Sequence, residues 1–409
     1  MYIKRHIEKA FDTASQMYPA VIVTGARQVG KSTFVKERVK NVKYVTFDDM
    51  RVREQAKKDP ALFFKTYAPP LILDEAQYAP ELFSEIKIIA DNGAEKGIFF
   101  LTGSQQFHLM KNVSESLAGR AGILDLKGLS YREIKGMSYD KPFLPTSQHL
   151  DEIGKESPKF DYWDIWEIIQ KGGLPEVYEK NYDADRREFF FNSYLRTYIE
   201  RDVRHLTEIS DERAFLNFMT AAAALTGQRL NYETMAQSVG KDVNTVKRWL
   251  SILVTSGLVF ILEPYHDNIL KRMAKTPKLH FMDTGLASFL CGWSTPKQLE
   301  SGAAAGAMFE TYVVGEIVKS FTNAGIDPRL SLFYYRDDEK REIDLVIKRN
   351  SALYPVEVKK AGYGQKSDIK AFECLKKSGL PVGEGGLICM DETKGFLTEK
   401  DRIIPVNMI

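Results

Sequence analysis

The sequence VIVTGARQVGKSTFVKERV, residues 21–39, places an apolar run before a loop that contains two glycines and a lysine. The apolar residues predict a buried strand, and the residues after the loop follow a helical pattern. Within the loop, the spacing of Gly25, Gly30, Lys31 and Ser32 fits the pattern G-x-x-x-x-G-K-[ST]. Two glycines let the backbone wrap with its N–H groups inward, and the helix begins with its positive dipole end at the same point. The stretch therefore predicts a phosphate-binding loop.

If the loop holds a nucleotide, Lys31 places a positive charge at the β- and γ-phosphates, and the Ser32 hydroxyl ligates Mg²⁺. The alternative is an ordinary strand-turn-helix connection whose glycines serve only the turn.

Hydrolysis of a nucleotide needs further groups, and the stretch PPLILDEAQ, residues 69–77, offers them. Residues 71–73 predict a short apolar strand that ends in Asp74, where a carboxylate can hold the Mg²⁺ shell. Glu75 follows as the candidate base for the attacking water. An apolar run followed by two acids is also common without any such role.

Three more strand-like runs, VKYVTFDD, GIFFLTGSQ and GILDLKGLS, are separated by segments of helix length. They predict an α/β fold with a parallel sheet and crossover helices. Ser104 and Gln105 end the second run, where a polar side chain can sense the γ-phosphate. Arg120 is a candidate arginine finger, acting within its chain or on a neighbour; the alternative is a solvated surface arginine.

The composition is that of a globular protein of two or three domains: 409 residues, 44% hydrophobic and 27% charged. A net charge of +2 excludes a broad basic field, so nucleic-acid binding requires a local patch. The three cysteines show no metal-ligand spacing, and we expect a reducing cytosol. The start lacks the apolar core of a signal peptide, and no apolar run is long enough to span a bilayer, which predicts a cytoplasmic protein without membrane association.

The phosphate-loop domain is predicted over residues 1–140. Residues 141–210 are predicted to be a linker followed by a helical region, because residues 141–161 lose periodicity and gather proline, serine and charge. Arg196, Glu200 and Arg204 are spaced for i,i+4 pairing on the surface of a helix.

Residues 211–265 predict a short helix capped by Asn231, a turn at residues 240–242, a second helix and an apolar strand. This is the plan of a winged helix-turn-helix. The outward positions of the second helix can contact phosphates or bases in a DNA major groove; they are Asn244, Thr245, Lys247 and Arg248. The alternative is that the unit packs against protein.

In the last predicted domain, residues 266–409, the stretch REIDLVIKRNSALYPVEVKKA predicts a β-hairpin. With a turn at residues 349–352, Asp344 lies opposite Glu357 and Glu342 lies opposite Lys359, all on one face. Facing carboxylates repel unless a cation lies between them, and a divalent metal is one such cation.

Asp344 with Glu357 and Lys359 resembles the D…E-x-K arrangement of restriction-endonuclease-like nucleases. There the carboxylates hold Mg²⁺ and the lysine orients or deprotonates water. Glu310 and Glu316 are candidates for a further acid from an earlier helix. The alternative is a solvent-facing hairpin with a Glu342–Lys359 ion pair, since a fold does not carry activity with it.

The ordered set TGARQVGKST, LILDEAQ, LTGSQQF, SLAGRAG, GGLPEVY, YIERDVR, KLHFMDTGLASFL, FETYVVGEIV and EIDLVI…PVEVK resembles a prokaryotic family of AAA-type ATPases. In that family the ATPase is joined to an uncharacterised C-terminal region of restriction-endonuclease-like type. The resemblance implies a metal-dependent, water-activating role for Asp74 and Glu75, a winged-helix insertion and a nuclease-like end. It implies ATP binding by Gly25, Ala26, Arg27, Gln28, Val29, Gly30, Lys31, Ser32 and Thr33.

Two functional hypotheses follow. In the first, an ATPase acts on double-stranded DNA through the winged helix and the nuclease-like domain, with ATP and Mg²⁺ as cofactors. In the second, a nucleotide-dependent regulator binds a protein partner, and the nuclease-like domain is inactive. An oligomer is compatible with either hypothesis.

Overall fold

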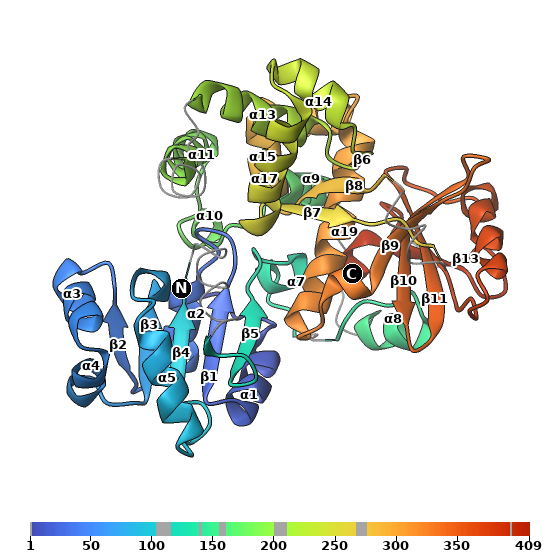
Figure 1. Ribbon diagram of the computed structural model, residues 1–409. Helices are drawn as coiled ribbons and strands as arrows, with labels where there is room; N and C mark the ends of the chain where they lie inside the picture. The colour runs from blue at the N-terminus through green and yellow to red at the C-terminus, as the bar shows by residue number, and fades with distance from the viewer. Residues whose placement is uncertain are drawn as a thin grey trace.

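The computed structural model describes residues 2–103, 116–138, 141–154, 161–199, 211–266, 276–392 and 395–409. The chain forms an N-terminal sheet domain, a mainly helical middle part and a C-terminal sheet domain, coloured blue, green to yellow, and orange to red in Figure 1. The predicted sensor Ser104, with Gln105, Glu200 and Arg204, lies outside the described residues. None of the described helices combines the length and the apolar character that a membrane span requires.

The N-terminal sheet has the strand order β2-β3-β4-β1-β5, and its neighbouring strands run parallel, as predicted. Its strands are β1 (Ala20–Thr24), β2 (Lys43–Thr46), β3 (Leu71–Asp74), β4 (Phe99–Thr102) and β5 (Ala121–Asp125). The helices are α1 (Glu8–Met17), α2 (Lys31–Arg38), α3 (Met50–Lys58), α4 (Pro60–Thr66) and α5 (Leu82–Asp91), with the short η1 (Ala76–Tyr78).

Alternate residues of the central strands supply two hydrophobic layers. Val21 and Val23 of β1 belong to the cluster that contains Phe11 of α1 and Phe34 of α2. Ile22 faces the other way and belongs to the cluster that contains residues of α4 and α5. The helices thus cover both faces of the sheet, because both faces of a buried parallel strand are apolar.

The middle part joins helices to a small antiparallel sheet of order β6-β8-β7. Its strands are β6 (Gln228–Arg229), β7 (Val259–Leu262) and β8 (Lys278–Phe281). The helices are α9 (Tyr162–Lys171), α10 (Pro175–Glu179), α11 (Ala184–Tyr198), α13 (Glu212–Ala224), α14 (Tyr232–Val239), α15 (Val243–Thr255), α17 (Thr284–Leu290) and α18 (Pro296–Ser301).

The predicted helix, glycine turn, helix and strand are present as α14, α15 and β7. The Asn231 side chain accepts a hydrogen bond from the Thr234 N–H, and Gly240 ends α14 in the left-handed conformation. The central strand of the small sheet is β8, so this unit extends beyond residue 265, its predicted end. The sequence did not indicate this boundary because β8 follows β7 only after 15 intervening residues.

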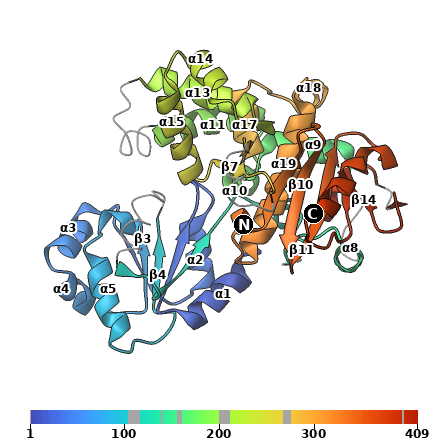
Figure 2. The same ribbon diagram turned by 45° about the vertical axis from the view of Figure 1, so that its right-hand side comes forward.

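The C-terminal domain places the helix α19 (Ala305–Asn323) beside a sheet of order β13-β14-β12-β11-β10-β9, as Figure 2 shows. Its strands are β9 (Leu332–Arg336), β10 (Glu342–Arg349), β11 (Ala352–Lys359), β12 (Gly386–Cys389), β13 (Gly395–Phe396) and β14 (Arg402–Pro405), with the short helices η3 (Pro328–Leu330), η4 (Lys366–Lys377) and η5 (Val406–Met408). The predicted hairpin is confirmed, since β10 and β11 pair antiparallel with Arg349 opposite Ala352.

Hydrogen bonds between distant residues join the parts. The segment after α7 (Tyr131–Ile134) contains α8 (Ser147–Gly154) and contacts the C-terminal domain: the Phe143 N–H donates to Ser320 Oγ at 3.0 Å, and the Ser147 N–H donates to Glu384 at 2.7 Å. The segment at residues 141–154 therefore contacts the C-terminal domain directly. Between the two later sheets, the Tyr265 N–H donates to Tyr334 O at 2.6 Å.

Candidate functional site

The loop between β1 and α2 requires both of its glycines. Gly25 has φ +138°, and a Cβ there would lie 2.1 Å from the carbonyl oxygen of Leu126. Gly30 has φ +90° and directly precedes the first residue of α2. Both conformations are costly for residues with a side chain, so the glycines of the predicted pattern are needed for this path of the chain.

Lys31 begins α2 and folds back over the loop. Its Nζ donates to the carbonyl oxygens of Gly25, at 3.0 Å, and Ala26, at 2.8 Å, and the residue is buried. The ammonium group thus lies at the centre of the loop, where the amino end of α2 adds the positive end of its dipole.

Asp74 ends β3 beside the loop and accepts hydrogen bonds from three hydroxyl groups. Ser32 Oγ donates to Oδ1 at 2.6 Å, Tyr44 Oη donates to Oδ2 at 2.5 Å, and Thr102 Oγ1 also donates to Oδ1. The predicted pair of Ser32 and Asp74 is therefore brought together. Sequence reasoning missed Tyr44 and Thr102, although both lie on strands that neighbour β3 on either side.

This arrangement suits Mg²⁺ bound together with a nucleotide. Asp74 is buried, and its hydrogen-bond donors among the described residues are neutral hydroxyls. Its charge is therefore left to be balanced by a cation. In the described part of the chain, no three His, Cys, Asp or Glu side chains form a ready metal site. Phosphate oxygens and water would complete the coordination, as Mg²⁺ prefers.

Glu75 lies at the opening of the same site. It has a left-handed backbone, with φ +54°, and its carboxylate accepts a hydrogen bond from the Gln77 side chain. One pocket is lined by the phosphate loop, by Asp48 and by residues that follow β3. Its residues are Arg27, Gln28, Gly30, Lys31, Ser32, Thr33, Asp48, Glu75 and Tyr78. The predicted base therefore faces the space in which the phosphates would lie.

Arg120 is remote from this pocket. It directly precedes β5, and the register pairs Ala121 with Ala20 at the start of β1. The loop follows the other end of β1, roughly 16 Å away along a strand of this length. The Arg120 guanidinium pairs with Asp91, at 2.5 and 2.9 Å. A finger role of Arg120 at the nucleotide of its own chain is thus contradicted, because Arg120 and the phosphate loop lie at opposite edges of the sheet.

Arg5, which the sequence did not single out, holds the phosphate loop through a hydrogen bond to its backbone. Its guanidinium donates to the carbonyl oxygens of Val29, at 3.0 Å, and Lys127, at 2.6 Å, and pairs with Glu133 at 3.2 Å. Burial alone would raise the pKa of Glu133, but the charges of Arg5 and His6 and the backbone N–H groups of His6 and Ser130 together hold it below its ordinary value. The loop is therefore fixed by a buried ion pair.

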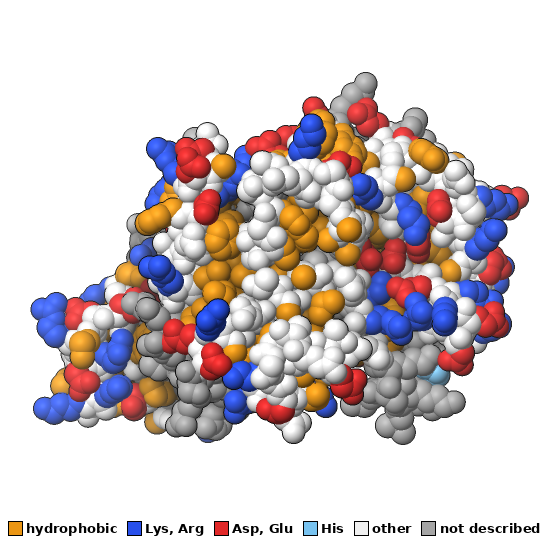
Figure 3. Space-filling model, turned by 90° about the horizontal axis from the view of Figure 1, so that it is seen from above, with side chains coloured by type: hydrophobic (Ala, Val, Ile, Leu, Met, Phe, Trp, Pro, Cys, Tyr) orange, Lys and Arg blue, Asp and Glu red, His pale blue; other side chains and the backbone are white. Residues whose placement is uncertain are grey.

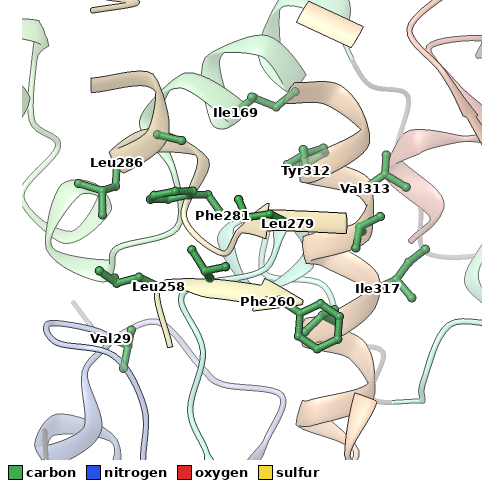
Figure 4. Packing of buried hydrophobic residues seen from close by; sticks show 14 of the residues in the cluster. Val29, Ile169, Leu258, Phe260, Leu279, Phe281, Leu286, Tyr312, Val313 and Ile317 are labelled. Carbon is green, nitrogen blue, oxygen red and sulfur yellow. The ribbon is translucent and has the colours of Figure 1, made fainter. Parts of the chain in front are cut away.

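The same loop contacts the middle part. A Cβ on Gly257 would lie 3.5 Å from the Ala26 nitrogen, and Figure 4 shows Val29 close to Leu258, in one buried cluster. On the other side, Gly173 O accepts from the Leu129 N–H at 2.6 Å, and Lys319 Nζ donates to Leu129 O at 2.9 Å. The phosphate-loop region thus has direct contacts with the middle part, and α19 contacts the segment after β5.

The acidic residues of the C-terminal hairpin form a second cluster. The register, continued by one residue, places Asp344 opposite Glu357, and Asp344 Oδ2 accepts from the Val358 N–H at 3.0 Å. Lys359 Nζ donates to Glu357 Oε1 at 2.7 Å. Asp344, Glu357 and Lys359 are therefore neighbours, as predicted.

Two details differ from the sequence expectation. Glu342 pairs with Arg336 and Lys278, and not with Lys359. Of the two candidate helix acids, Glu310 belongs to the cluster, whereas Glu316 pairs with Lys319 and accepts from the Tyr131 N–H. The reason is helical geometry, since residues six apart lie on different faces of α19.

Lys278 of β8 is the cation of this cluster. Its Nζ lies 2.9 Å from Glu310, 2.7 Å from Glu342 and 3.5 Å from Asp344, and its side chain is 3% exposed. Burial alone would lower the pKa of Lys278, but the three carboxylates outweigh it and raise the pKa above its ordinary value. Burial and the charge of Asp344 raise the pKa of both Glu310 and Glu357 to about 8.

The outer face of α15 is accessible at several predicted positions. Asn244, Lys247 and Arg248 are exposed. Thr245 is half-buried, and its N–H and hydroxyl donate to the capping carboxylate of Asp242. In Figure 3, which views the molecule from above, basic and acidic side chains are interspersed and hydrophobic ones gather toward the middle. Lys247 and Arg248 are thus exposed basic residues on the outer face of α15.

Comparison with known families assigns the first part of the chain. Residues 17–135 match the family model "AAA domain". The N-terminal domain is therefore similar to AAA domains. Residues 162–297 and 305–409 match two domains of unknown function, DUF8612 and DUF4143. The parallel sheet and the loop geometry agree with this assignment, and the AAA-type match makes ATP binding with Mg²⁺ the expected chemistry of the domain.

Curated relatives and solved structures resemble the chain over most of its length. "Uncharacterized protein Rv2008c" of Mycobacterium tuberculosis and "Uncharacterized protein Mb2031c" of Mycobacterium bovis are each 28% identical over 84% of this chain and 70% of their own. The Walker-type ATPase of Pyrococcus abyssi has TM-score 0.44 and 15% identity, covering 71% of this chain and 96% of its own. A signal transduction ATPase of Pyrococcus horikoshii has TM-score 0.27 and 11% identity, covering 79% and 47%.

Proposed function

We propose that the protein is a Mg²⁺-dependent ATPase that couples nucleotide binding and hydrolysis to its middle part and its C-terminal domain. The observation that carries the proposal is the buried contact of Ser32 Oγ with Asp74 Oδ1, at 2.6 Å, beside a glycine loop centred on Lys31. This is the donor set that a magnesium nucleotide requires.

In this proposal each residue has a separate task. The backbone N–H groups of residues 25–33 hold the phosphates, and Lys31 exchanges its two loop carbonyl contacts for phosphate oxygens of higher charge. Ser32 and Asp74 would hold the Mg²⁺, which supplies charge stabilisation at the phosphates. Glu75 orients and deprotonates the attacking water from the opening of the pocket.

Coupling uses the contacts of the loop. Nucleotide binding draws Lys31 and the loop backbone toward the phosphates. Ala26 of that loop lies beside Gly257, and Val29 belongs to the same buried cluster as Leu258. The loop therefore has a direct mechanical connection to the start of β7, which follows α15.

Double-stranded DNA is the partner that we propose for α15. The plan of α14, Gly240, α15 and the β6-β8-β7 sheet suits a winged helix-turn-helix, and Lys247 and Arg248 are exposed on its second helix. In the C-terminal domain, the order α19, β9, β10, β11, η4, β12 and the D…E-x-K residues suit a nuclease-like fold.

A protein partner, with an inactive nuclease-like domain, is the second candidate. It is favoured by Lys278, which fills the acidic cluster, and by the near-neutral net charge of +2. In this case ATP switches the surface of the middle part between two states, and α15 contacts protein.

The test is ATP turnover by the full chain with Mg²⁺, with EDTA, and with or without duplex DNA. We expect turnover that requires Mg²⁺ and is lost in Asp74→Asn. Stimulation by DNA that disappears in Lys247→Ala/Arg248→Ala supports the DNA proposal. Turnover that is indifferent to DNA, with no binding to DNA at low salt, favours the protein partner. Absence of any Mg²⁺-dependent turnover would contradict the ATPase proposal itself.

A further inference from the structure

The phosphate pocket is smaller than the pockets that usually hold a ligand of nucleotide size. Its volume is about 240 Å³, whereas small-molecule sites have volumes of roughly 300–1,000 Å³. Lys31, Ser32 and Glu75 line this space, and in the proposed function they act on the phosphates, the metal ion and the water. The base and the ribose of a bound nucleotide therefore need a neighbouring space.

A second pocket adjoins the first at Gln28, which lines both. Its volume is about 510 Å³. Its other residues belong to α10, α11 and the turn between them: Glu176, Tyr182, Asp185, Arg186, Phe189, Phe190, Ser193 and Thr197. The phosphate loop and the middle part approach closely here, since a Cβ on Gly30 would lie 3.7 Å from Pro175 Cγ at the start of α10. Figure 1 shows α10 and α11 above the N-terminal domain.

The two pockets differ in charge. The phosphate pocket contains Lys31 and the amino end of α2, which attract an anion. The second pocket contains the carboxylates of Glu176 and Asp185 together with Arg186. Carboxylates repel phosphate but accept hydrogen bonds from hydroxyl and amino groups. The second pocket thus suits the uncharged part of a nucleotide better than its phosphates.

Phe189 gives this pocket an exposed aromatic ring. Its side chain is 75% exposed, whereas the next residue on either turn-facing side of the core, Phe190 and Phe191, is buried. The opposite face of α11 is fixed in the middle part, where the ring of Phe191 stacks on Phe289 of α17 with 5.5 Å between centroids. An exposed ring on a fixed helix is a platform on which a nucleotide base can stack.

We propose that the pocket between Gln28 and α11 binds the base and the ribose of the nucleotide, with the base stacked on Phe189. The inference rests on the proposed function, because it requires the phosphates to lie in the loop. One nucleotide then contacts the N-terminal domain through its phosphates and the middle part through its base.

The contact at α11 continues to the helix α15. Tyr198 ends α11, and its Oη lies 2.8 Å from the Oγ of Ser256, which directly follows α15. A base stacked on Phe189 therefore connects the phosphate loop to the helix that carries Lys247 and Arg248. A triphosphate without a base lacks this connection.

The experiment compares the affinities of ATP and inorganic tripolyphosphate for the full chain, with Mg²⁺, by isothermal titration calorimetry. We expect Phe189→Ala to weaken ATP binding roughly tenfold, because a stacking contact is lost, and to leave tripolyphosphate binding unchanged. Phe189→Trp should bind ATP as the unmodified chain does. Trp163→Ala is the matched control, since Trp163 is an exposed aromatic residue of α9 outside the residues that line the pocket; it should change neither affinity.

Two results would overturn the proposal. One is an unchanged ATP affinity in Phe189→Ala. The other is an equal loss of affinity for ATP and tripolyphosphate in that variant, since the effect would then not concern the base.

The unmodified chain and Lys31→Ala separate this inference from the proposed function. Lys31→Ala should weaken the binding of both ligands. An unmodified chain that binds neither ligand would contradict the proposed function and this inference with it. An unmodified chain that binds ATP no more tightly than tripolyphosphate would contradict the base pocket alone.

Fluorescence of Phe189→Trp gives a second readout at the same position. ATP should quench the emission of the added indole, and tripolyphosphate should not, because only ATP brings a base against the ring. The unmodified chain, with its four tryptophans, provides the background signal. An equal response to both ligands would place the base elsewhere.

Discussion

The phosphate loop and the C-terminal acidic cluster both place a lysine among buried acceptors, but they balance charge in opposite ways. At the loop, three neutral hydroxyls donate to Asp74, and Lys31 contacts backbone carbonyls. At the cluster, Lys278 contacts three carboxylates directly. The first arrangement leaves a negative charge for a metal ion to balance, whereas the second already contains a protein cation among its carboxylates.

The difference shows that residue types alone do not define a metal site. Both regions contain the acids and the lysine that a metal-dependent enzyme uses. What separates them is whether a protein cation already lies at the point where the carboxylates meet, because a buried carboxylate needs only one source of positive charge.

The largest effect that we expect at the loop is on catalysis. Glu75→Gln should keep ATP binding and slow turnover by roughly 10²–10⁴-fold, because it removes the base but none of the phosphate contacts. Single-turnover hydrolysis and a fluorescent-nucleotide binding assay measure the two quantities. Full activity in Glu75→Gln would assign the base to another residue.

At the cluster, removing the internal cation should reduce stability. Lys278→Met leaves three carboxylates without their shared partner, which costs about 3–5 kcal/mol in the free energy of unfolding. Urea denaturation of the unmodified chain and the variant measures this loss. An unchanged stability would mean that the ion pairs contribute nothing, and the contrast between the two sites would fail.

Lys31→Ala tests the lysine of the loop. ATP affinity should fall about 100-fold, since a charge-assisted contact to phosphate is lost at a buried position. Lys40→Ala, an exposed lysine that follows α2, is the control and should bind ATP as the unmodified chain does. Isothermal titration calorimetry compares them, and equal affinities would contradict the loop assignment.

His280, next to the cluster on β8, should make stability depend on pH. Burial, and then the charge of Lys278, lower its pKa to about 3 from 6.5. Because the unfolded state binds the proton more readily, stability is present above pH 6.5 and is lost as pH falls toward 3. Between pH 7 and pH 5 this loss is about 2 kcal/mol.

His280→Gln should lack that part of the pH dependence. Urea denaturation of both proteins at pH 7 and pH 5 gives the two differences in the free energy of unfolding. Identical differences would mean that His280 is not held neutral at the cluster.

The smallest effect concerns DNA. Lys247→Ala/Arg248→Ala should lower the slope of log K against log salt by about 2 and weaken binding roughly tenfold, because two phosphate contacts are lost. Lys376→Ala/Lys377→Ala, on η4, is the matched control. Fluorescence anisotropy with a labelled duplex measures both. Unchanged binding would remove α15 from the proposed interface.

Several elements were predictable because their signals are local. The loop at residues 25–33, the strand that ends in Asp74 and the β10–β11 hairpin each follow from a short pattern of glycines, apolar residues and turn residues. The pairing of Ser32 with Asp74 followed as well, since parallel strands end at one edge of the sheet.

Other features depend on contacts between distant residues. Arg120 resembles a finger in its local sequence, yet strand order puts it at the wrong edge for its own nucleotide. Arg5 supports a loop 24 residues later, and Lys278 reaches acids 32 and 64 residues later. No periodic or motif signal connects such positions.

The sequence by itself determined the phosphate loop, the hairpin and most of the candidate acids and lysines, because backbone conformation and strand burial are set by neighbouring residues. Only the tertiary structure decided which charges meet. Lys278 contacts Glu310, Glu342 and Asp344 because the small sheet packs against α19 and β9. Electrostatic energy depends on distance in space, and the order of residues along the chain does not fix that distance.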